Sequence, residues 1–288
     1  MANAAMSYTS AVVISVRECL ARAVELESDT ARLDVETLLA YVMQQSRTWL
    51  YTWPEKILTT EQQQLFEQLL QQRKQNVPVA YLTGVREFWS LPLQVNRSTL
   101  IPRPDTELLV ELALLAPLRP DARVLDLGTG TGAVALALVS ERSTWHVVAV
   151  DQHEQAVALA RSNAQQCKLA LDVLQGDWFA PVTGQQFSMI VSNPPYIAES
   201  DAHLRQGDVA HEPRTALVAA DNGLANLQHI VQTASQFLLS PGYLLLEHGS
   251  GQGESVRNMY RQAGFSDVQT HRDLGGNERV TRGVWHHA

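Results

Sequence analysis

The sequence predicts an α/β protein in which a mostly parallel sheet follows a small bundle of helices. Two observations predict this fold. In the later two-thirds of the chain, short apolar runs of strand length alternate with helical runs, an order typical of parallel sheets. In the first quarter, apolar residues recur only at helical spacing. With 288 residues, of which 45% are hydrophobic, the chain can bury enough apolar surface for two domains.

Residues 11–76 have apolar side chains at the spacing of α-helices. Apolar side chains recur there at steps of three and four residues: Val12, Val13, Val16, Leu20 and Val24; Leu38, Leu39, Val42 and Met43; and Leu65, Phe66, Leu69 and Leu70. Asn76-Val77-Pro78 ends the last helix, and a hairpin-like stretch follows over 88–95. We therefore expect a helical domain over 1–78, a β-hairpin linker over 79–98 and an α/β domain over 99–288.

A glycine-rich loop follows the first predicted strand of the sheet. The strand covers 122–127, the loop is Gly128-Thr129-Gly130-Thr131-Gly132, and a helical run covers 133–140. Glycines let the backbone approach a ligand closely, and the start of the helix presents free N–H groups to its polar part. Asp126 lies two positions before the loop, where it either reaches an ammonium group of the ligand or stabilises the N–H groups of the loop itself.

Acidic residues follow two further strands. Asp151 comes directly after the apolar run 147–150, where a carboxylate can accept both hydroxyls of a ribose. Gly176-Asp177-Trp178-Phe179 follows the next short apolar run. Asp177 or a backbone group is placed there to meet an adenine amine, and Trp178 to form a wall beside the base. An ordinary capped loop with a core aromatic fits the same four residues equally well.

Asn193-Pro194-Pro195-Tyr196 is the most informative motif. It follows the apolar run 187–191, so it lies at the edge of the sheet where α/β proteins bind ligands, and its two prolines hold the backbone extended. The side-chain oxygen of Asn193 and the carbonyl of Pro194 can each accept one hydrogen of a target NH₂ group, while the Tyr196 ring packs on the target's face. The motif predicts a clamp for an amide or an exocyclic amine, although a plain Pro-rich turn has the same composition.

Together, these motifs resemble the class I S-adenosylmethionine-dependent methyltransferases, in which they occur in this order. Three further segments, 82–89, 100–107 and 277–281, narrow the resemblance to the bacterial PrmC/HemK family. The resemblance implies a Rossmann-like methyltransferase domain with a seven-stranded, mostly parallel sheet. It also implies methyl transfer from S-adenosylmethionine to the side-chain amide nitrogen, N5, of the glutamine in the Gly-Gly-Gln motif of class I peptide chain release factors, with S-adenosylhomocysteine as product.

The resemblance also assigns a role to each motif residue. It implies cofactor contacts from Gly128, Thr129, Gly130, Thr131, Gly132, Asp151, Asp177, Trp178 and Asn193. It implies that Asn193, Pro194, Pro195 and Tyr196 hold the target glutamine, and that Asn193, Pro194 and Tyr196 act in catalysis. We expect direct methyl transfer without a covalent enzyme intermediate. Because remote contacts can supply binding energy that one glutamine cannot, we expect the helical domain to recognise the substrate protein.

Two further segments have less specific assignments. The segment from Arg103 to Glu107 either initiates a helix or, as in related methyltransferases, closes over the methionine end of the cofactor. Glu212, Pro213 and Arg214 follow the clamp closely enough to shape the target pocket, but we expect solvated loop residues there.

Charge narrows the substrate class. A formal net charge of −8 and a sequence pI near 5.6 provide no broad basic face for a phosphate backbone, so we expect a protein partner and no direct nucleic acid contact. The main alternative is a DNA adenine or RNA guanine N-methyltransferase, because the clamp would hold a flipped base amine equally well. A methyltransferase-like binding protein without activity is a second alternative. A nicotinamide dehydrogenase is a third, and it leaves the N-P-P-Y motif unexplained.

Several expectations concern metals and the cell. The nine histidines show no spacing typical of zinc, so we predict no metal site. The sequence has no signal-peptide pattern and no apolar run near the ~20 residues of a membrane span, so we expect a cytoplasmic protein without membrane contact. Cys19 and Cys167 are expected to be reduced packing residues. Since no unpaired apolar helix face stands out, we expect a monomer.

Overall fold

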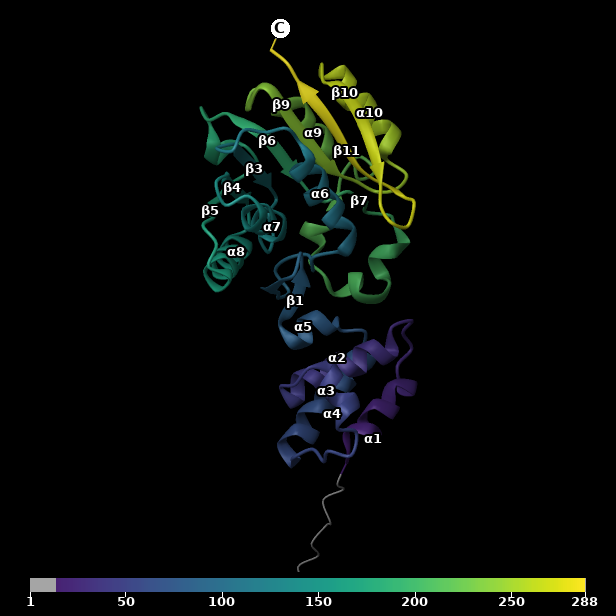
Figure 1. The fold of residues 1–288 in the computed structure, drawn as a ribbon. Helices are drawn as coiled ribbons and strands as arrows, with labels where there is room; N and C mark the ends of the chain where they lie inside the picture. Colours follow the sequence, from purple (N-terminus) through teal and green to yellow (C-terminus); the bar gives the residue numbers. More distant parts are fainter. Residues whose placement is uncertain (1–13, 288) are drawn as a thin grey trace, which may run out of the picture. The chain divides into compact units, whose positions relative to one another are not determined.

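The computed structural model describes residues 14–287, which form two compact units divided between Thr83 and Gly84 (Figure 1). Residues up to Thr83 form a helical unit, and residues from Gly84 onward form an α/β unit. The predicted helical positions Val12 and Val13, like the rest of residues 1–13 of the predicted helical domain, lie outside the described residues. Within 14–287, no helix is both long enough and apolar enough to cross a membrane.

The helical unit has one apolar core. Its described α-helices are α1 (Val16–Ala21), α2 (Ala31–Met43), α3 (Arg47–Thr52), α4 (Thr60–Lys74) and α5 (Val79–Thr83). Ser15 and Thr59 cap α1 and α4 through reciprocal hydrogen bonds with the side chains three residues later. The apolar stripes of α2 and α4 meet in the core, where Leu38, Phe66 and Leu70 are almost completely buried. The predicted helical bundle is confirmed.

Val24 departs from the predicted apolar pattern. A short 3₁₀ turn, η1 (Arg22–Glu25), follows α1, and Val24 is 90% exposed on it. A 3₁₀ helix has three residues per turn instead of 3.6, so η1 rotates Val24 away from the face that buries Val16 and Cys19. The apolar spacing therefore continued beyond the end of the α-helix.

The predicted linker range 79–98 contains two different structures. Residues 79–83 form α5, whose apolar side chains pack against the core of the helical unit. β1 (Val85–Phe88) and β2 (Leu91–Gln94) form an antiparallel hairpin in the α/β unit. Trp89 and Ser90 have positive φ angles of 52° and 59°, as a type I′ hairpin turn requires.

The α/β unit is built on a seven-stranded sheet with the strand order β10-β11-β9-β6-β3-β4-β5. The strands are β3 (Arg123–Leu127), β4 (His146–Asp151), β5 (Asp172–Gln175), β6 (Phe187–Ser192), β9 (Leu238–Glu247), β10 (Ser266–Arg272) and β11 (Glu278–Trp285). Neighbouring strands from β5 to β9 pair in parallel, whereas β11 pairs antiparallel with both β9 and β10. The predicted seven-stranded, mostly parallel sheet is confirmed.

Helices cover both faces of this sheet (Figure 1). One apolar cluster contains α6 (Glu107–Leu115), α7 (Ala133–Glu141) and α8 (Glu154–Cys167), and the other contains α9 (Ala225–Ala234) and α10 (Gly253–Gln262). Successive strand residues point to opposite clusters, as Val124 and Leu125 of β3 do. Because both faces are covered, a ligand can reach the sheet only at its ends.

Two irregular segments border the carboxyl ends of the strands. One leads into α6 and contains the turn η2 (Pro104–Thr106). The other joins β6 to α9 and contains two short parallel strands and three turns: β7 (Ile197–Ala198), η4 (Ala202–Arg205), η5 (Gly207–His211), η6 (Arg214–Ala216) and β8 (Val218–Ala219). A further turn, η3 (Ala180–Val182), follows β5.

Candidate active site

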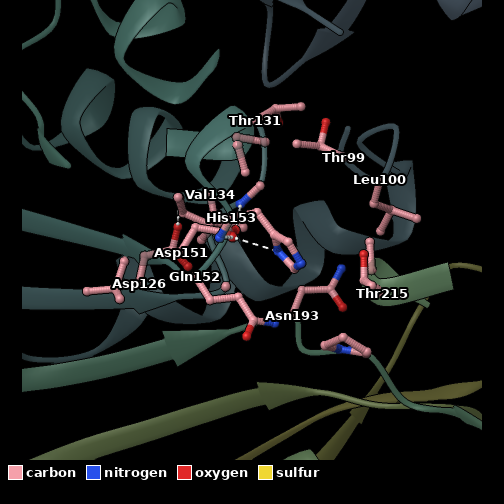
Figure 2. Close-up of a pocket in the computed structure, with 18 of the residues that line it drawn as sticks. Thr99, Leu100, Asp126, Thr131, Val134, Asp151, Gln152, His153, Asn193 and Thr215 are labelled. Carbon is pink, nitrogen blue, oxygen red and sulfur yellow. Dashed lines mark hydrogen bonds and ion pairs between the residues drawn. The ribbon is translucent and has the colours of Figure 1, made fainter. Parts of the chain in front are cut away.

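A cavity of about 390 Å³ lies where β3, β4, β5 and β6 end (Figure 2). The residue directly after each of these strands lines it: Gly128, Gln152, Gly176 and Asn193. Parallel pairing brings these four positions to one edge of the sheet, although they are far apart in the chain. β3 and β6 are neighbours at the centre of the sheet. After β3 the chain continues to β4 on one side, whereas after β6 the next strand of the sheet is β9 on the other side. Open α/β sheets form a binding crevice between two such strands.

The glycine loop turns sharply between β3 and α7. Gly128 and Gly130 have positive φ angles of 69° and 55°, which glycine adopts without strain. The N–H groups of Gly128 and Thr129 donate to the Val150 carbonyl of β4 at 2.9 and 3.0 Å. The adjacent strand thereby holds the loop, and Thr129, Gly130 and Thr131 also line the cavity.

Gly132 contributes to helix packing and is not among the residues that line the cavity. It is the N-cap of α7, with a φ angle of 82°. A Cβ atom at this position would lie 3.3 Å from atoms of both Ala160 and Leu136, so glycine allows α7 to pack closely on α8. The cofactor contact that the family resemblance implies for Gly132 stays a prediction.

Asp126 is a buried carboxyl group on the cavity wall, with 2% of its surface exposed. Its Oδ2 atom accepts a hydrogen bond of 2.6 Å from the Thr129 hydroxyl. Burial raises the pKa of Asp126 to about 7, although hydrogen bonds from Thr129 and from the Ala135 N–H lower it. Asp151 raises it further. Asp126 therefore binds a hydroxyl of the glycine loop, and its contact with a ligand ammonium stays a prediction.

Asp151 faces the cavity from the end of β4. Its two carboxylate oxygens accept hydrogen bonds from the N–H groups of Gly130 and His153, both at 2.9 Å. The Nδ1 atom of the His153 ring lies 3.3 Å from Oδ1 of Asp151 (Figure 2). A carboxylate has about four acceptor positions, so Asp151 retains capacity for a pair of hydroxyl groups.

The loop after β5 places Asp177 and Trp178 on the cavity wall. Trp178 has a positive φ angle of 42°. Its ring lies against the glycine loop, since a Cβ atom at Gly128 would be 3.8 Å from it. The ring of His229 lies nearby, with its centroid 6.2 Å from that of Trp178. The cavity therefore has an aromatic wall beside the glycine loop.

Asn193 enters the cavity directly after β6. Its Nδ2 atom donates to the Thr106 hydroxyl oxygen at 3.1 Å. No residue within 14–287 donates a hydrogen bond to its Oδ1 atom. The side-chain oxygen is therefore the part of Asn193 that is available to a ligand.

The other residues of the clamp motif divide into two groups. Pro195 lines the cavity, whereas Pro194 and Tyr196 are not among its lining residues. The Tyr196 ring packs against the apolar cluster of α9 and α10, and its hydroxyl donates to Glu247 Oε1 at 3.1 Å. Burial raises the pKa of Tyr196, and so does the nearby Glu247, so the phenol is neutral. The predicted packing of this ring on the target stays a prediction.

The segments that begin α9 and α10 hold the backbone of the clamp. Asn226 Nδ2 donates to the Pro195 carbonyl at 3.0 Å, and Gln252 Nε2 donates to the Tyr196 carbonyl at 2.9 Å. Gly223 packs so closely that a Cβ atom there would lie 2.1 Å from the Tyr196 carbonyl oxygen. These contacts fix the loop in one position beside the cavity.

An ion pair joins the two irregular segments. The guanidinium of Arg103, which lines the cavity, donates to Glu212 Oε2, and the Ile101 N–H donates to Glu212 Oε1 at 3.1 Å. The Glu212 side chain has no exposed surface, so the expectation of a solvated residue was wrong for this position. Burial raises the pKa of Glu212, and the Arg103 guanidinium opposes that rise.

Most of the predicted site residues meet at this cavity. Those that line it are Gly128, Thr129, Gly130, Thr131, Asp151, Asp177, Trp178, Asn193 and Pro195. Polar lining residues that sequence reasoning missed include Thr99, His153 and Asn226. His153 carried a signal, because it lies two positions after Asp151. Nothing local in the sequence marks Thr99 or Asn226.

Known protein families match both units. Residues 15–84 match the PrmC N-terminal domain, and residues 104–212 match the methyltransferase small domain. The release factor glutamine methyltransferase of Shewanella oneidensis is 53% identical over 277 residues, which cover 93% of this chain and 97% of that protein. Those of Salmonella typhimurium and Escherichia coli are 57% identical over 258 residues and 54% identical over 260 residues. These alignments cover 89% and 90% of this chain, and 93% and 94% of the relatives.

Solved methyltransferase structures share the fold. A crystal structure of a methyltransferase from Pyrococcus furiosus has a TM-score of 0.54 and 15% identity, covering 77% of this chain and 98% of its own. The 16S rRNA N2 G1207 methyltransferase of T. thermophilus, solved with AdoMet and guanosine, has a TM-score of 0.51 and 22% identity, covering 69% and 49%. These likenesses show the fold alone. The relatives that are more than half identical over nearly their whole length show that the chain belongs to the family of release factor glutamine methyltransferases.

Proposed function

We propose that this protein transfers a methyl group from S-adenosylmethionine to the side-chain amide nitrogen, N5, of the glutamine in the Gly-Gly-Gln motif of class I peptide chain release factors. Family membership supports both the reaction and the substrate class. The observation at the site that carries the proposal is the orientation of Asn193. Because Nδ2 is held by Thr106, Oδ1 remains to accept a hydrogen from a substrate amide.

The cavity residues fit S-adenosylmethionine, which supplies an electrophilic methyl group on a sulfonium centre when bound. Asp151 can accept both ribose hydroxyls, and Asp177 and Trp178 form a polar and aromatic wall suited to adenine. Gly128 and Gly130 keep the loop free of side chains at positive φ angles, so its backbone can approach the ligand. The proposal also includes cofactor contacts from the remaining residues of the glycine loop and from Asn193.

The clamp residues hold the amide nitrogen and stabilise the charge that develops on it. An amide nitrogen is a weak nucleophile, because its lone pair is delocalised into the carbonyl group. Asn193 Oδ1 and the Pro194 carbonyl each accept one of its N–H groups, which favours positive charge on nitrogen as the N–C bond forms. Holding the nitrogen in line with the methyl group can contribute roughly 7–11 kcal/mol. The carbon–sulfur bond breaks in the same step, and the proton leaves afterwards to water.

The proposal extends to the partner and its location. Pro195 and Tyr196 complete the loop that holds the glutamine, and the helical unit recognises the release factor away from the reacting group. The net charge of −8 favours a protein surface over nucleic acid. The protein acts as a monomer, and because translation termination occurs in the cytoplasm, it acts there.

The experiment that tests this function is transfer of radiolabelled methyl from S-adenosylmethionine to a purified class I release factor. A factor with the Gly-Gly-Gln glutamine changed to alanine, DNA and ribosomal RNA are tested in parallel. Label on the native factor alone is the expected result. Label on nucleic acid would instead indicate a DNA adenine or RNA guanine N-methyltransferase, and cofactor binding without any transfer would indicate a binding protein.

The variant Asn193→Ala tests the clamp. It removes a hydrogen bond to a group that becomes charged, worth about 1.5–3 kcal/mol, so kcat should fall about tenfold to more than a hundredfold. Asn258→Ala is the matched control, because Asn258 is exposed on α10 and does not line the cavity. Full turnover by Asn193→Ala would refute the clamp.

A further inference from the structure

The proposed clamp works in only one orientation of the Asn193 amide. A substrate N–H needs an acceptor, which Oδ1 provides and the Nδ2 amino group does not. A rotation of the side-chain amide by half a turn would exchange the two groups. Since Nδ2 donates to Thr106 Oγ1, the hydroxyl of Thr106 decides which group faces the cavity.

A threonine hydroxyl can permit either orientation. It carries one proton and two lone pairs, so it can donate or accept. If its proton points at Asn193, the amide oxygen turns toward Thr106 and the NH₂ group faces the substrate. If the proton is held elsewhere, the hydroxyl oxygen can only accept from Asn193 Nδ2. Thr106 lines the cavity but is only 4% exposed, so we look for a neighbouring protein group that can hold that proton.

Glu247 at the end of β9 is the group placed to do so. It is 1% exposed, and its Oε2 atom is buried and has no hydrogen-bond partner among residues 14–287. Ser192 pairs with Leu246 in the sheet, so Glu247 lies at the same strand end as Asn193. Burial raises the pKa of Glu247 to about 7. The Thr106 hydroxyl lowers it, as a donor to the carboxylate does, and so do Arg279 and the Tyr196 hydroxyl. The carboxylate of Asp105 acts in the raising direction.

We propose that Glu247 and Thr106 are positioning residues that fix the Asn193 amide with its oxygen toward the substrate. The ionised carboxylate of Glu247 can only accept, so the Thr106 proton points to it. The Thr106 oxygen then accepts from Asn193 Nδ2, and Oδ1 is left facing the cavity. This inference rests on the proposed function and explains why Asn193 presents its amide oxygen, and not its NH₂ group, to the substrate.

The same carboxylate acts on both ends of the N-P-P-Y motif. It orients Asn193 through Thr106, and its Oε1 atom accepts directly from the Tyr196 hydroxyl. A buried carboxylate with an incompletely satisfied oxygen destabilises a fold. Because Glu247 contacts the clamp, a role in the proposed active site would explain why this destabilising group is present.

Two variants release the Asn193 amide from its fixed orientation in different ways. Thr106→Val cannot accept a hydrogen bond from Asn193. Glu247→Gln can donate to the Thr106 oxygen, which frees the Thr106 proton to point at Asn193. Each should lower kcat on the release factor about tenfold to a hundredfold, the loss expected when an interaction with the transition state is removed. The KM for the factor and the affinity for S-adenosylmethionine should change less than about threefold, because their other contacts remain.

Two further variants serve as controls. Thr106→Ser keeps the hydroxyl and should restore most of the rate. Glu278→Gln is a matched change at a carboxylate that pairs with Arg257 and does not line the cavity; it should leave kcat unchanged. Thermal unfolding of every variant identifies those that fail to fold. If Glu247→Gln is among them, Thr106→Val alone carries the test.

A release factor with glutamate in place of the target glutamine tests directly which end of the Asn193 amide faces the substrate. Its carboxylate offers no N–H group, so the two acceptors of the wild-type clamp should reject it. In Thr106→Val and Glu247→Gln the NH₂ group of Asn193 can turn toward the substrate. The inhibition constant of this factor, divided by the KM of the native factor, should therefore fall at least about fivefold. A merely structural defect would weaken the binding of both factors alike.

The pH profile and the wild-type reaction complete the test. Wild-type kcat should fall as the pH is lowered through the titration of Glu247, because the protonated carboxyl group can donate to Thr106; Glu247→Gln should lack that limb. Unchanged kcat in both variants beside an active wild-type protein would overturn the positioning role alone. Equal loss toward both release factors would do the same. A wild-type protein that leaves the native factor unlabelled would overturn this inference together with the proposed function.

Discussion

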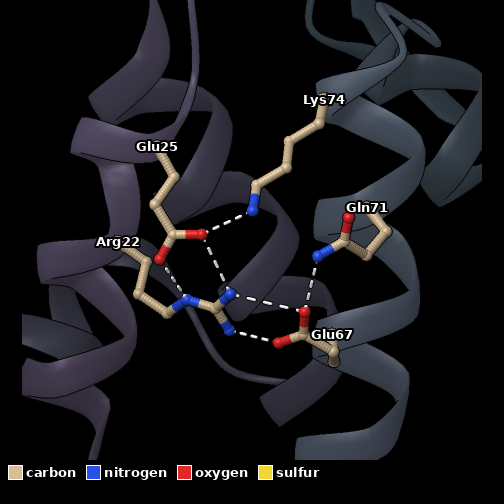
Figure 3. Close-up of polar contacts among 5 residues, drawn as sticks. All are labelled: Arg22, Glu25, Glu67, Gln71 and Lys74. Carbon is tan, nitrogen blue, oxygen red and sulfur yellow. Dashed lines mark hydrogen bonds and ion pairs between the residues drawn. The ribbon is translucent and has the colours of Figure 1, made fainter.

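The pKa values of the acids in the helical unit and of the buried acids near the cavity of the α/β unit are shifted in opposite directions. In the helical unit, lowered pKa values are found for Glu18, Glu25, Glu36, Glu61 and Glu67. Hydrogen bonds from Arg22 and Lys74 lower the pKa of Glu25 to about 2. Figure 3 shows Arg22 between Glu25 and Glu67, so that this cluster joins η1 to α4. Glu25, Glu36 and Glu67 are paired with cations, whereas hydrogen bonds at the starts of α1 and α4 lower the pKa values of Glu18 and Glu61.

In the α/β unit, three buried carboxyl groups near the cavity have raised pKa values: Asp126, Glu212 and Glu247. Burial is the largest cause for each of them. A buried acid with a raised pKa makes folding less favourable at neutral pH, and such groups are typical of functional sites. The comparison shows that the helical unit uses its acids for stability, whereas the α/β unit retains costly acids around its proposed active site.

The opposite pKa shifts predict that these acids change the stability of the fold with pH in opposite directions. Where the folded pKa is lowered, as for Glu25, the contribution to stability is present above about pH 4.5 and is lost as the pH falls toward 2. Where it is raised, as for Asp126 and Glu247, the contribution is present below the unfolded pKa and is lost as the pH rises through about 7. His248, whose pKa burial lowers, opposes the second effect below pH 6.5, so variants are needed to isolate each acid.

The largest effect is expected at an acid of the helical unit that is itself buried. Arg73 Nε donates to Asp34 Oδ2 at 2.8 Å, and the two side chains are 8% and 9% exposed. Arg73→Met leaves Asp34 without its cation and should cost about 3–5 kcal/mol. Hydrogen exchange in peptides from α2 and α4 measures this loss within the helical unit.

The control for this prediction is Arg17→Met, which breaks the exposed pair with Glu55 and should cost less than about 1 kcal/mol. Equal costs for the two variants would contradict the idea that burial decides how much a paired acid contributes.

An intermediate effect is expected for Asp126→Asn in the α/β unit without cofactor. Asparagine cannot ionise, so between pH 5 and 8 the wild-type protein should lose stability relative to the variant, by on the order of 2 kcal/mol. Unfolding in urea at several pH values, followed by hydrogen exchange in β3 and α7, measures the difference. Parallel curves for the two proteins would show that Asp126 does not carry the predicted cost.

The smallest effect is expected for Glu25→Gln. The Glu25 side chain is 32% exposed, so solvent screens its ion pairs and the loss at pH 7 should be about 0.5 kcal/mol. The difference from wild type should shrink as the pH falls toward 2, because the wild-type carboxylate is then protonated. The same hydrogen-exchange measurement at pH 7 and pH 3 checks it. A loss that grows at acid pH would reverse the assigned sign.

The strands and the loops after them could be predicted because their signals are local. An apolar run followed by glycine, aspartate or Asn-Pro-Pro marks both a strand and its end. Parallel pairing then brings those ends together without further information, so Gly128, Asp151 and Asn193 meet at one cavity. The helical bundle was equally local, but two of its predicted apolar positions are exposed: Val24, where a change from α to 3₁₀ geometry follows no apolar signal, and Leu65 on α4.

The contacts that tune the site could not be predicted, because they join distant segments. Asn193 and Thr106 are 87 residues apart, and Ile101 and Glu212 are 111 residues apart. From sequence alone, a glutamate in a short polar segment, such as Glu212, is predicted to be solvated. The distant residues that bury it are known only from the structure. Similarly, nothing in the sequence around Glu247 distinguishes a strand end from a group that acts on the clamp.

The position of β11 has a consequence for the order of folding. β11 follows β10 in the chain, yet it lies between β10 and β9 in the sheet. β10 therefore has no place in the sheet until β11 has paired with β9, and before that step β9 exposes an unpaired edge that favours aggregation. β11 also brings Arg279, whose guanidinium pairs with Asp105 and Asp273. An intermediate without β11 would hold the strands that carry the glycine loop, but it would lack the charge beside Glu247 and keep an open edge.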